Sequence, residues 1–308
     1  MPRQRNLVVL RAGRNSLHAR WFDKGAPRNW DLYICPYQEM PEQGDLDLTM
    51  GRVINGPKWT GLRELLNEWD GWRDYDQVWL PDDDILASQE SINLLFDMAE
   101  ALSFDLCQPA LDEDSYYAHY MTMRNRSCFA RRVAFVEIMA PCFSGQVLQD
   151  LLPTFDETTT GWGWGLDSLW PKLLDYRNVG IIDGVTVCHT RPVGKFRDDE
   201  LDRLVHEEAD RVMEDHDCSL IQTTYSMIGP DLQAMPLSGD ELTVALVDGW
   251  RYLFDANPAV LSLIVAAQAP ARAVAAYPME GTPAKGLVDQ GDAAARVPTL
   301  ANVLGTRM

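Results

Sequence analysis

The chain has 308 residues, of which 46% are hydrophobic, so it can bury a full core as one large domain or as one domain with an appendage. This composition excludes a disordered or fibrous protein. The formal net charge of -19 leaves no basic stripe of the kind with which nucleic-acid-binding proteins neutralise phosphates. We therefore expect no nucleic-acid partner, and a metal ion or a few placed cations must hold any anionic ligand.

The cysteines and the N-terminus indicate a cytoplasmic protein. The six cysteines are scattered singly without a CxxC pair, as expected of buried thiols in a reducing compartment. Too few residues precede the strand-like run that begins at Leu7 to make a signal peptide. The longest later apolar stretch, residues 259–276, contains Pro270 and Arg272 and falls short of a membrane span.

Strand and helix patterns alternate along the first two thirds of the chain. Short apolar runs predict strands at residues 7–10, 31–35, 77–80, 106–111, 133–143 and 179–189. Apolar residues at helical spacing predict helices at residues 59–69, 88–102, 146–152 and about 167–176. This order predicts an α/β fold with a twisted, mostly parallel sheet flanked by helices, which binds its ligand at the carboxyl ends of the strands.

The character of the sequence changes beyond Arg197. Residues 198–217 hold ten acids and two arginines, yet apolar residues recur near helical spacing, which predicts a docked helix with a solvated acidic face. A second helix is predicted at residues 239–254. From about residue 269, alanine, glycine and proline dominate without a period. We expect a catalytic domain over 1–197, a C-terminal helical segment over 198–268 and a poorly packed tail over 269–308.

The most informative motif is the aspartate triplet Asp82, Asp83 and Asp84, which follows the apolar run 78–80. Side chains alternate along an extended segment, so Asp82 and Asp84 point the same way and Asp83 points elsewhere. The pair can then grip one Mg²⁺ or Mn²⁺ and the diphosphate that the ion carries. The alternative is an acidic turn that caps the helix beginning at Ser88, and the triplet alone fits both readings.

The segment Gly-Trp-Gly-Trp-Gly-Leu-Asp at residues 161–167 is the second motif. Its alternate glycines permit unusual backbone angles, and Trp162 and Trp164 offer flat apolar faces that suit a sugar acceptor. Asp167 stands where a helix is expected to begin, so the helix dipole favours an ionised carboxylate that can accept a proton. In the alternative reading, Asp167 is the N-cap and the tryptophans fill a core.

Cations near a strand-terminal histidine form the third element. His189 ends the strand predicted at 179–189 and is followed by Arg191 and Lys195, which suit a diphosphate lying on a metal ion. A lone histidine is more often a satisfied polar residue than a ligand. Lys58 at a helix start and Arg11 after the first strand are further candidates for phosphate or nucleotide contacts, although each fits a surface charge equally well.

These motifs together carry a resemblance. An Asp-x-Asp after a central strand, a later Gly-Trp-Gly loop ending in an acid and a strand-terminal His occur in the same order in metal-dependent glycosyltransferases of the GT-A fold, such as the beta-1,4-galactosyltransferases. More closely, about residues 6–195 resemble the glycosyltransferase-like domain family of unknown function number seven-zero-seven. The segments that carry this likeness are 13–18, 30–32, 58–59, 78–84, 136–144 and 163–167.

The resemblance implies a glycosyltransferase that uses a nucleotide-sugar donor, a glycan or small-molecule acceptor and Mn²⁺ or Mg²⁺. It implies that Asp84 binds the metal directly, that Asp82 contacts the metal or the ribose, and that His189 completes the protein ligands. The metal would offset charge on the departing diphosphate. The expected donor-binding residues are Arg11, Gly13, Lys58, Asp82, Asp83, Arg191 and Lys195.

The resemblance also implies an inverting displacement in which Asp167 deprotonates the acceptor hydroxyl. Glu137 is the second candidate for a catalytic carboxylate. The alternative for Glu137 is a buried acid that pairs with Arg131, Arg132 or His119.

Two other functions use the same residues. A metal-dependent phosphoesterase or pyrophosphohydrolase would activate water with these carboxylates and need no acceptor. A non-catalytic nucleotide-binding or glycan-binding module would keep the fold without the reaction, because a fold does not dictate chemistry.

Overall fold

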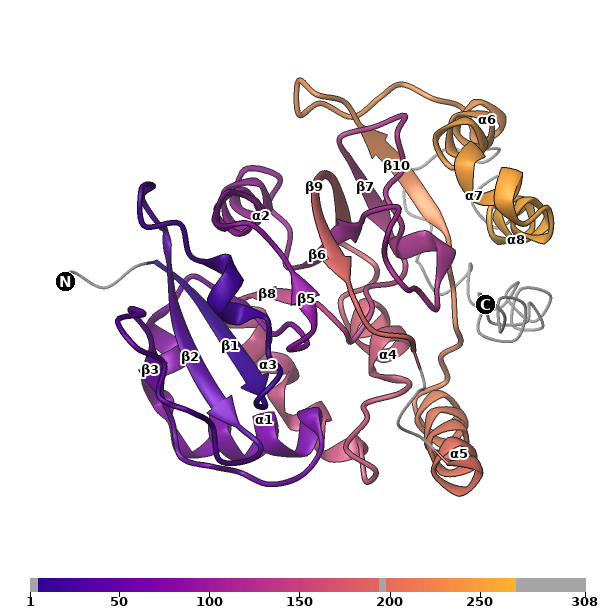
Figure 1. The fold of residues 1–308 in the computed structure, drawn as a ribbon. Helices are drawn as coiled ribbons and strands as arrows, with labels where there is room; N and C mark the ends of the chain where they lie inside the picture. Colours follow the sequence, from indigo (N-terminus) through magenta and orange to yellow (C-terminus); the bar gives the residue numbers. More distant parts are fainter. Residues whose placement is uncertain (1–4, 194–197, 270–308) are drawn as a thin grey trace.

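The computed structural model describes residues 5–193 and 198–269 of the chain (Figure 1). Its strands are β1 (Asn6–Ala12), β2 (Trp30–Pro36), β3 (Thr49–Met50), β4 (Gln77–Trp79), β5 (Ile85–Leu86), β6 (Leu106–Leu111), β7 (Ala130–Val133), β8 (Cys142–Ser144), β9 (Val179–His189) and β10 (Thr224–Ile228). Its α-helices are α1 (Lys58–Glu68), α2 (Gln89–Ala101), α3 (Gly145–Leu151), α4 (Leu166–Leu173), α5 (Asp199–Asp215), α6 (Gly239–Gly249), α7 (Arg251–Ala256) and α8 (Ala259–Ala267). Short 3-10 helices lie at His18–Trp21, Asp70–Asp74, Tyr120–Thr122 and Leu152–Glu157.

The described strands form one mixed sheet in the order β10-β7-β9-β6-β8-β4-β1-β2-β3, and β5 pairs with β9. Strand β8 runs antiparallel to both β4 and β6, and β7 runs antiparallel to both β9 and β10. The other strands along this path run in one direction, so the predicted α/β fold with a mostly parallel sheet is confirmed. Helix α1 packs on β1 and β2, α2 on β6 and β9, and α3 on β4 and β8.

The carboxyl ends of three parallel strands bring the predicted motifs to one edge of this sheet. Gly13 follows β1, the aspartate triplet follows β4, and His189 ends β9. Figure 1 shows β5 lying beside the end of β9, where it carries the chain on from the triplet. This edge is where ligands bind in open α/β sheets.

The predicted strand over residues 133–143 is wrong. The chain forms two short strands there, β7 and β8, which occupy different places in the sheet. Pro141 has no N–H to donate to a ladder, and regular pairing resumes only at Cys142. Residues 134–141 therefore leave the sheet as a loop that carries Glu137.

The segment predicted as C-terminal helices contributes to the sheet as well. Helix α5 forms as expected and the region 239–254 folds as α6 and α7, but β10 lies between them and pairs with β7. One hydrophobic core extends from Leu7 in β1 to Ala267 in α8. The predicted tail lies outside the described residues except for its first residue.

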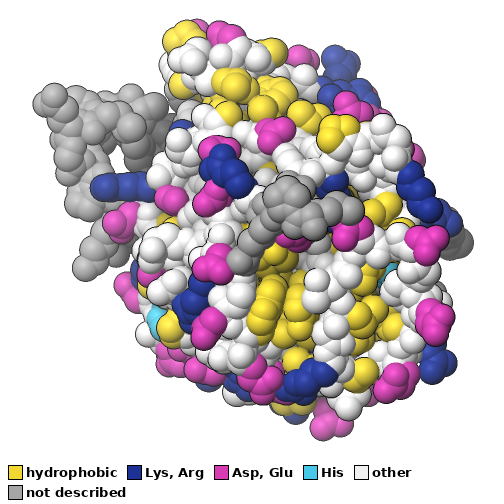
Figure 2. Space-filling model, turned by 90° about the vertical axis from the view of Figure 1, so that its left-hand side faces the viewer, with side chains coloured by type: hydrophobic (Ala, Val, Ile, Leu, Met, Phe, Trp, Pro, Cys, Tyr) yellow, Lys and Arg dark blue, Asp and Glu magenta, His cyan; other side chains and the backbone are white. Residues whose placement is uncertain are grey.

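All six cysteines are unpaired, and Cys35, Cys107 and Cys142 are buried while the other three are partly exposed. Among the helices of residues 5–193 and 198–269, none is long and apolar enough to cross a membrane. Figure 2 shows a face on which Lys and Arg side chains are interspersed among Asp and Glu side chains rather than gathered in a stripe.

Candidate functional site

The aspartate triplet sends its three side chains to different partners. Asp82 Oδ1 lies 2.6 Å from Lys58 Nζ, and Asp84 Oδ2 lies 3.3 Å from His189 Nε2. Asp83 points away from the other two, to residues after β1 and β2, as predicted, but Asp83 and Asp84 lie in a turn and not in the extended segment that the prediction assumed. The capping alternative for the triplet is wrong, because Ser88 Oγ caps α2 by accepting a hydrogen bond from the Ser91 N–H.

Asp83 joins two other predicted donor-binding residues, Gly13 and Arg191, to one another. Its Oδ2 accepts hydrogen bonds from the Gly13 N–H at 2.9 Å and from the Tyr37 hydroxyl at 3.0 Å. Its Oδ1 accepts from Arg191 Nη1 at 3.0 Å, and Arg191 Nη2 also donates to the Asn15 carbonyl at 2.7 Å. The buried Asp83 thus fixes the loop after β1 against the segment after β9.

Arg11 lies inside the fold. Its buried guanidinium donates to the carbonyls of Ile54 and Gly56, each at 2.8 Å, and to the Cys35 carbonyl at 3.3 Å. The structure therefore places Arg11 as a tie between β2 and the approach to α1. Lys195 lies outside the described residues.

Pairing of β5 with β9 brings Asp84 and His189 together, because Ile85 stands opposite His189 in the register. His189 Nδ1 lies 2.7 Å from the Tyr116 carbonyl, which can only accept, so Nδ1 carries a proton and Nε2 faces Asp84. Burial alone lowers the pKa of His189, but the hydrogen bond and charge of Asp84 outweigh it and raise that pKa to about 9. Burial alone raises the pKa of Asp84, but His189 and Arg191 outweigh it and lower that pKa.

This pair fits a divalent cation. Two ligands held about 2.1–2.2 Å from one cation at a right angle stand about 3 Å apart, close to the spacing of Asp84 Oδ2 and His189 Nε2. A backbone carbonyl on the other ring nitrogen is the usual support of a metal-binding histidine. No group of three or more His, Cys, Asp and Glu side chains with metal-binding geometry occurs within residues 5–193 and 198–269. Two of the three predicted ligands are therefore brought together, while Asp82 faces Lys58.

Lys58 is held by three acceptors at the first residue of α1. Its ammonium donates to Asp82 Oδ1 and to the carbonyls of Ile138 and Met139, at 2.6, 2.8 and 3.0 Å. These contacts match the three N–H donors of a lysine. Burial lowers the pKa of Lys58, and the charges of Asp82, Asp84 and Glu137 oppose that shift. Lys58 therefore supplies positive charge within the carboxylate cluster.

The predicted pairing of Glu137 is wrong. Arg131 binds Asp183 through two hydrogen bonds of 2.9 Å, and both side chains are completely buried. His119 contacts Gln222, and Arg132 reaches Asn178 at 3.4 Å.

Glu137 is only 8% exposed, and its Oε2 has no hydrogen-bond partner in the described structure. Burial raises the pKa of Glu137 to about 8, with a further rise from the charges of Asp167 and Asp82 and an opposing effect of His189. The raised pKa favours the protonated form of Glu137 at neutral pH, and its role as a catalytic carboxylate stays a prediction. His189, Asp167 and Asp82 thus act on Glu137 electrostatically, and Lys58 ties the two residues after Glu137 to Asp82.

The glycines of the Gly-Trp loop adopt left-handed backbone angles. Gly161, Gly163 and Gly165 have φ values of 77°, 79° and 93°. A Cβ on Gly163 would lie 2.3 Å from Trp59 Cδ1, so the loop packs directly on α1. Only glycine meets both conditions without strain.

Trp162 and Trp164 are partly exposed, so the alternative in which both fill the core is wrong. The ring of Trp164 meets His206 of α5 edge to face, with the ring centres 4.7 Å apart.

Asp167 is the second residue of α4 rather than its N-cap. Gly165 takes the cap position without a side-chain hydrogen bond, so the capping alternative for Asp167 is wrong. Burial raises the pKa of Asp167 to about 7, although hydrogen bonds from Ser168 and the backbone oppose the rise. The sequence suggested that the helix start keeps this carboxylate ionised, but the raised pKa shows that it is not fully ionised near neutral pH. A pKa near neutrality suits a general base.

Sequence reasoning missed Glu208. This acid lies on the buried side of α5, three residues after Val205 and four before Val212, and accepts hydrogen bonds from Thr158, Thr159 and Thr160. An acid at a position of the apolar stripe was the available signal.

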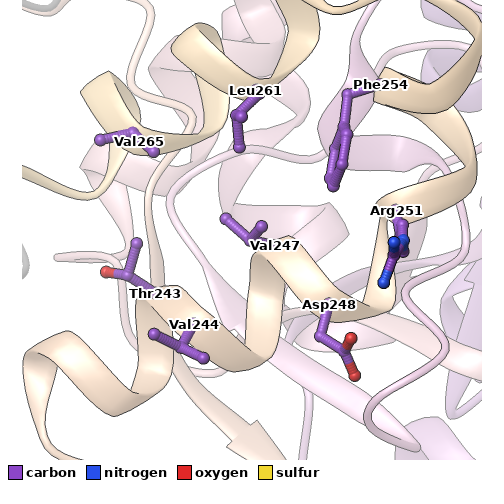
Figure 3. Close-up of a pocket in the computed structure, with 8 residues that line it drawn as sticks. All are labelled: Thr243, Val244, Val247, Asp248, Arg251, Phe254, Leu261 and Val265. Carbon is purple, nitrogen blue, oxygen red and sulfur yellow. The ribbon is translucent and has the colours of Figure 1, made fainter.

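A separate concavity lies between α6, α7 and α8 (Figure 3). Its volume is about 450 Å³, and none of the predicted site residues lines it. Its lining residues are Thr243, Val244, Val247, Asp248, Arg251, Phe254, Leu261 and Val265.

No protein-family model and no curated protein matches the chain. Among solved structures, S. aureus TarS 1-349 in complex with UDP-GlcNAc matches with a TM-score of 0.41 and 12% identity, over 88% of this chain and 81% of that chain. TarS 1-349 in complex with UDP matches with a TM-score of 0.41 and 10% identity, over 98% and 92%. A further TarS structure matches with a TM-score of 0.38 and 12% identity, where the likeness covers 67% of this chain but only 39% of TarS.

Proposed function

We propose that this protein transfers a sugar from a nucleotide-sugar donor to an acceptor hydroxyl with the help of a divalent cation. The observation that carries the proposal is that the start of α1 joins two kinds of group, because Lys58 binds Asp82 and the next residue donates a backbone hydrogen bond to the Gly-Trp loop. The Asp84–His189 pair fits a cation, and Asp167 has a pKa near neutrality. A reaction in which one oxygen leaves with negative charge while another loses a proton needs both.

The donor half of the site lies at the carboxyl ends of β4 and β9. A divalent cation held by Asp84 and His189 would offset the charge that builds on a nucleoside diphosphate as it leaves. The Tyr116 carbonyl orients the imidazole, and Arg191 Nε lies 4.0 Å from Asp84 Oδ2. Lys58 balances Asp82, so the cluster does not present unopposed negative charge to an anionic donor.

The acceptor half is the Gly-Trp loop and the start of α4. Trp162 and Trp164 supply aromatic faces of the kind on which sugars stack. Asp167 takes the proton of the acceptor hydroxyl while that oxygen bonds to the anomeric carbon, and the electrons of the broken bond leave with the diphosphate. Displacement in one step inverts the anomeric centre.

The first arm of the test measures donor binding. Titration calorimetry with a panel of nucleoside diphosphates and nucleotide sugars should detect binding only with Mn²⁺ or Mg²⁺. Asp84→Ala and His189→Ala should each remove most of that affinity, whereas Asp70→Ala changes an exposed carboxylate that pairs with Arg73 and should bind like wild type. Tight metal-independent binding that is equal in wild type and both site variants would refute the cation site.

The second arm separates binding from chemistry. Asn keeps the shape of Asp167 but cannot take a proton. Asp167→Asn should retain metal-dependent donor binding while transfer falls by roughly 10²-fold or more. Near-normal transfer would exclude Asp167 as the base. Hydrolysis of a simple phosphodiester without an acceptor would instead identify a phosphoesterase, and donor binding without any turnover would identify a binding module.

A further inference from the structure

One buried carboxylate on α5 holds three consecutive threonines before the Gly-Trp loop. Glu208 is 5% exposed and lies about fifty residues further along the chain than these threonines. Its Oε1 accepts from the hydroxyls of Thr158 and Thr160, at 2.8 and 2.7 Å. Its Oε2 accepts from the N–H and hydroxyl of Thr159, at 2.6 and 2.8 Å, and from the N–H of Thr160 at 2.7 Å. We call residues 158–160 the threonine strap.

These five donors keep Glu208 ionised inside the protein. Burial alone raises the pKa of Glu208, but the hydrogen bonds of the strap outweigh it and lower that pKa. Hydrogen bonds to a charged acceptor are about twice as strong as neutral ones. The position of this carboxylate therefore fixes the position of the threonine strap.

The strap in turn holds the backbone of the Gly-Trp loop. The Thr158 hydroxyl, which donates to Glu208, accepts from the N–H groups of Gly161 and Gly163 at 2.9 and 3.1 Å. The Thr160 hydroxyl accepts from the Trp162 N–H at 3.2 Å. A loop with three glycines at left-handed angles has little stiffness of its own, so these bonds select its conformation.

Helix α5 also touches the loop directly. A Cβ on Gly165 would lie 3.1 Å from Val212 Cβ, so α5 packs closely against the N-cap residue of α4. Two residues before Glu208 on α5, His206 meets the ring of Trp164. The same helix therefore contacts both ends of the segment that leads to Asp167.

We propose that Glu208 is a positioning residue that fixes the acceptor half of the site through the threonine strap. This inference rests on the proposed function and deepens it, because it makes α5 part of the acceptor site rather than an appendage. Misplacement of a reacting group by about 1 Å can cost on the order of 10²-fold in rate, whereas donor binding uses residues on other elements. Loss of the hydrogen bonds between Glu208 and the threonine strap should thus reduce turnover and acceptor binding but not donor affinity.

Glu208→Gln and Glu207→Gln form a matched pair for the test. Both replace a carboxylate with an amide on the same helix, but Glu207 is exposed and pairs with Arg203. The amide nitrogen of a glutamine cannot accept a hydrogen bond, so Glu208→Gln removes the acceptor for part of the strap. Thr158→Val removes the hydroxyl that links strap and loop, and Thr158→Ser retains it.

Hydrogen exchange by mass spectrometry should show about tenfold faster exchange over residues 159–163 in Glu208→Gln and Thr158→Val, with the rest of the protein unchanged. Glu207→Gln and Thr158→Ser should match wild type. Metal-dependent donor affinity should stay the same in all four variants, while kcat falls about tenfold or more in Glu208→Gln and Thr158→Val.

Unchanged exchange over residues 159–163 in Glu208→Gln and Thr158→Val would show that Glu208 and the threonine strap do not hold the loop. Faster exchange in these variants with wild-type kcat and acceptor KM would show that Glu208 is not a positioning residue. If Glu208→Gln fails to fold, the two Thr158 variants decide both points. If wild type itself transfers no sugar, the proposed function fails, and the exchange result still decides whether Glu208 holds the loop.

Discussion

Glu137 and Asp167 act on one another electrostatically but titrate in different ranges. Burial raises both pKa values, to about 8 for Glu137 and to about 7 for Asp167. Near neutral pH, Asp167 is about half ionised and can accept a proton, whereas Glu137 mostly holds one. The two carboxyl groups thus have different roles available to them, which their residue types alone do not reveal.

Glu137→Gln should leave transfer near neutral pH close to wild type, because the amide resembles the protonated acid. It should also flatten the dependence of stability on pH. Wild type holds a proton on Glu137 that the unfolded chain releases near pH 4.5, so this stabilisation is full below that pH and is lost as the pH rises through about 8. The charged groups that interact with Glu137 are His189, Asp167, Asp82 and Lys58.

Melting temperatures of wild type and Glu137→Gln between about pH 5 and pH 9 measure this difference. Transfer rates at neutral pH measure the catalytic role. A collapse of transfer in Glu137→Gln, with normal transfer in Asp167→Asn, would exchange the roles of the two carboxyl groups.

Side-chain direction within the triplet was predictable, but its partners were not. Alternation predicts that Asp83 points away from Asp82 and Asp84, and it does, although Asp83 and Asp84 lie in a turn after β4 and not in a strand. The contact between Lys58 and Asp82 spans 24 residues and depends on where α1 lies against the loop after β4. Burial of Asp167 likewise arises from packing of the whole domain, so the sequence suggested an ionised carboxylate where the structure gives a raised pKa.

At the scale of elements, the Gly-Trp loop depends on one close approach. Gly163→Ala should destabilise the protein by roughly 2–5 kcal/mol, through a left-handed residue with a side chain and a clash with Trp59. Gly44→Ala is the matched control, because Gly44 also has a positive φ, 61°, but has nothing within 4 Å of an added Cβ. This control should cost only about 1–2 kcal/mol.

Urea unfolding of both variants and wild type measures the difference in free energy of unfolding. Equal losses in Gly163→Ala and Gly44→Ala would show that Trp59 moves aside and that the contact does not constrain the loop.

Long periodic elements were predicted well, and short ones were not. The bounds of β6 and β9 agree with the sequence prediction, and α2 lies one residue inside it at each end. Most of the run predicted as a strand, residues 133–143, is the loop between β7 and β8, and no local signal other than Pro141 marks it as a loop. Helix α5 was predicted, but its acidic face was treated as solvated throughout, and Glu208 points into the protein.

At the scale of the whole molecule, α8 closes the end of the core. The Thr223 hydroxyl donates to the Ala267 carbonyl at 2.7 Å. The Gln268 amide lies against the backbone of Thr224, with its nitrogen 2.9 Å from the carbonyl and its oxygen 3.2 Å from the N–H. These contacts attach α8 to β10 and so to the sheet.

Two truncations should therefore differ sharply. A chain that ends at residue 269 should keep its melting temperature and its metal-dependent donor binding, because the described core ends at Ala267. A chain that ends at residue 258 also loses the buried side chains of Val260, Leu263 and Ile264, each worth about 1.5–3 kcal/mol when buried. We expect this shorter chain to unfold or aggregate.

Circular dichroism on heating and calorimetry with a nucleoside diphosphate compare the two truncations. Unfolding of the chain that ends at residue 269 would show that residues 270–308 belong to the stable fold. Equal stability of both truncations would show that α8 is dispensable.

The fold class was readable from the alternation of strand and helix patterns, because that alternation reflects local periodicity. The shared core was not. Sequence composition changes beyond Arg197, but composition reports solvent exposure and not contact. The position of Glu208 in the apolar stripe indicates burial, but neither it nor the sequence of β10 identifies the partners, which lie more than forty residues earlier.

The threonine strap is synthesised before the residue that anchors it. A ribosome releases residues 158–160 about fifty residues before Glu208, so a growing chain carries the Gly-Trp loop for a time without its anchor. The groups that fit a cation, Asp84 and His189, are both present before Glu208 emerges. An unfinished chain therefore possesses every residue of the proposed donor site while the loop of the proposed acceptor site is still unsecured.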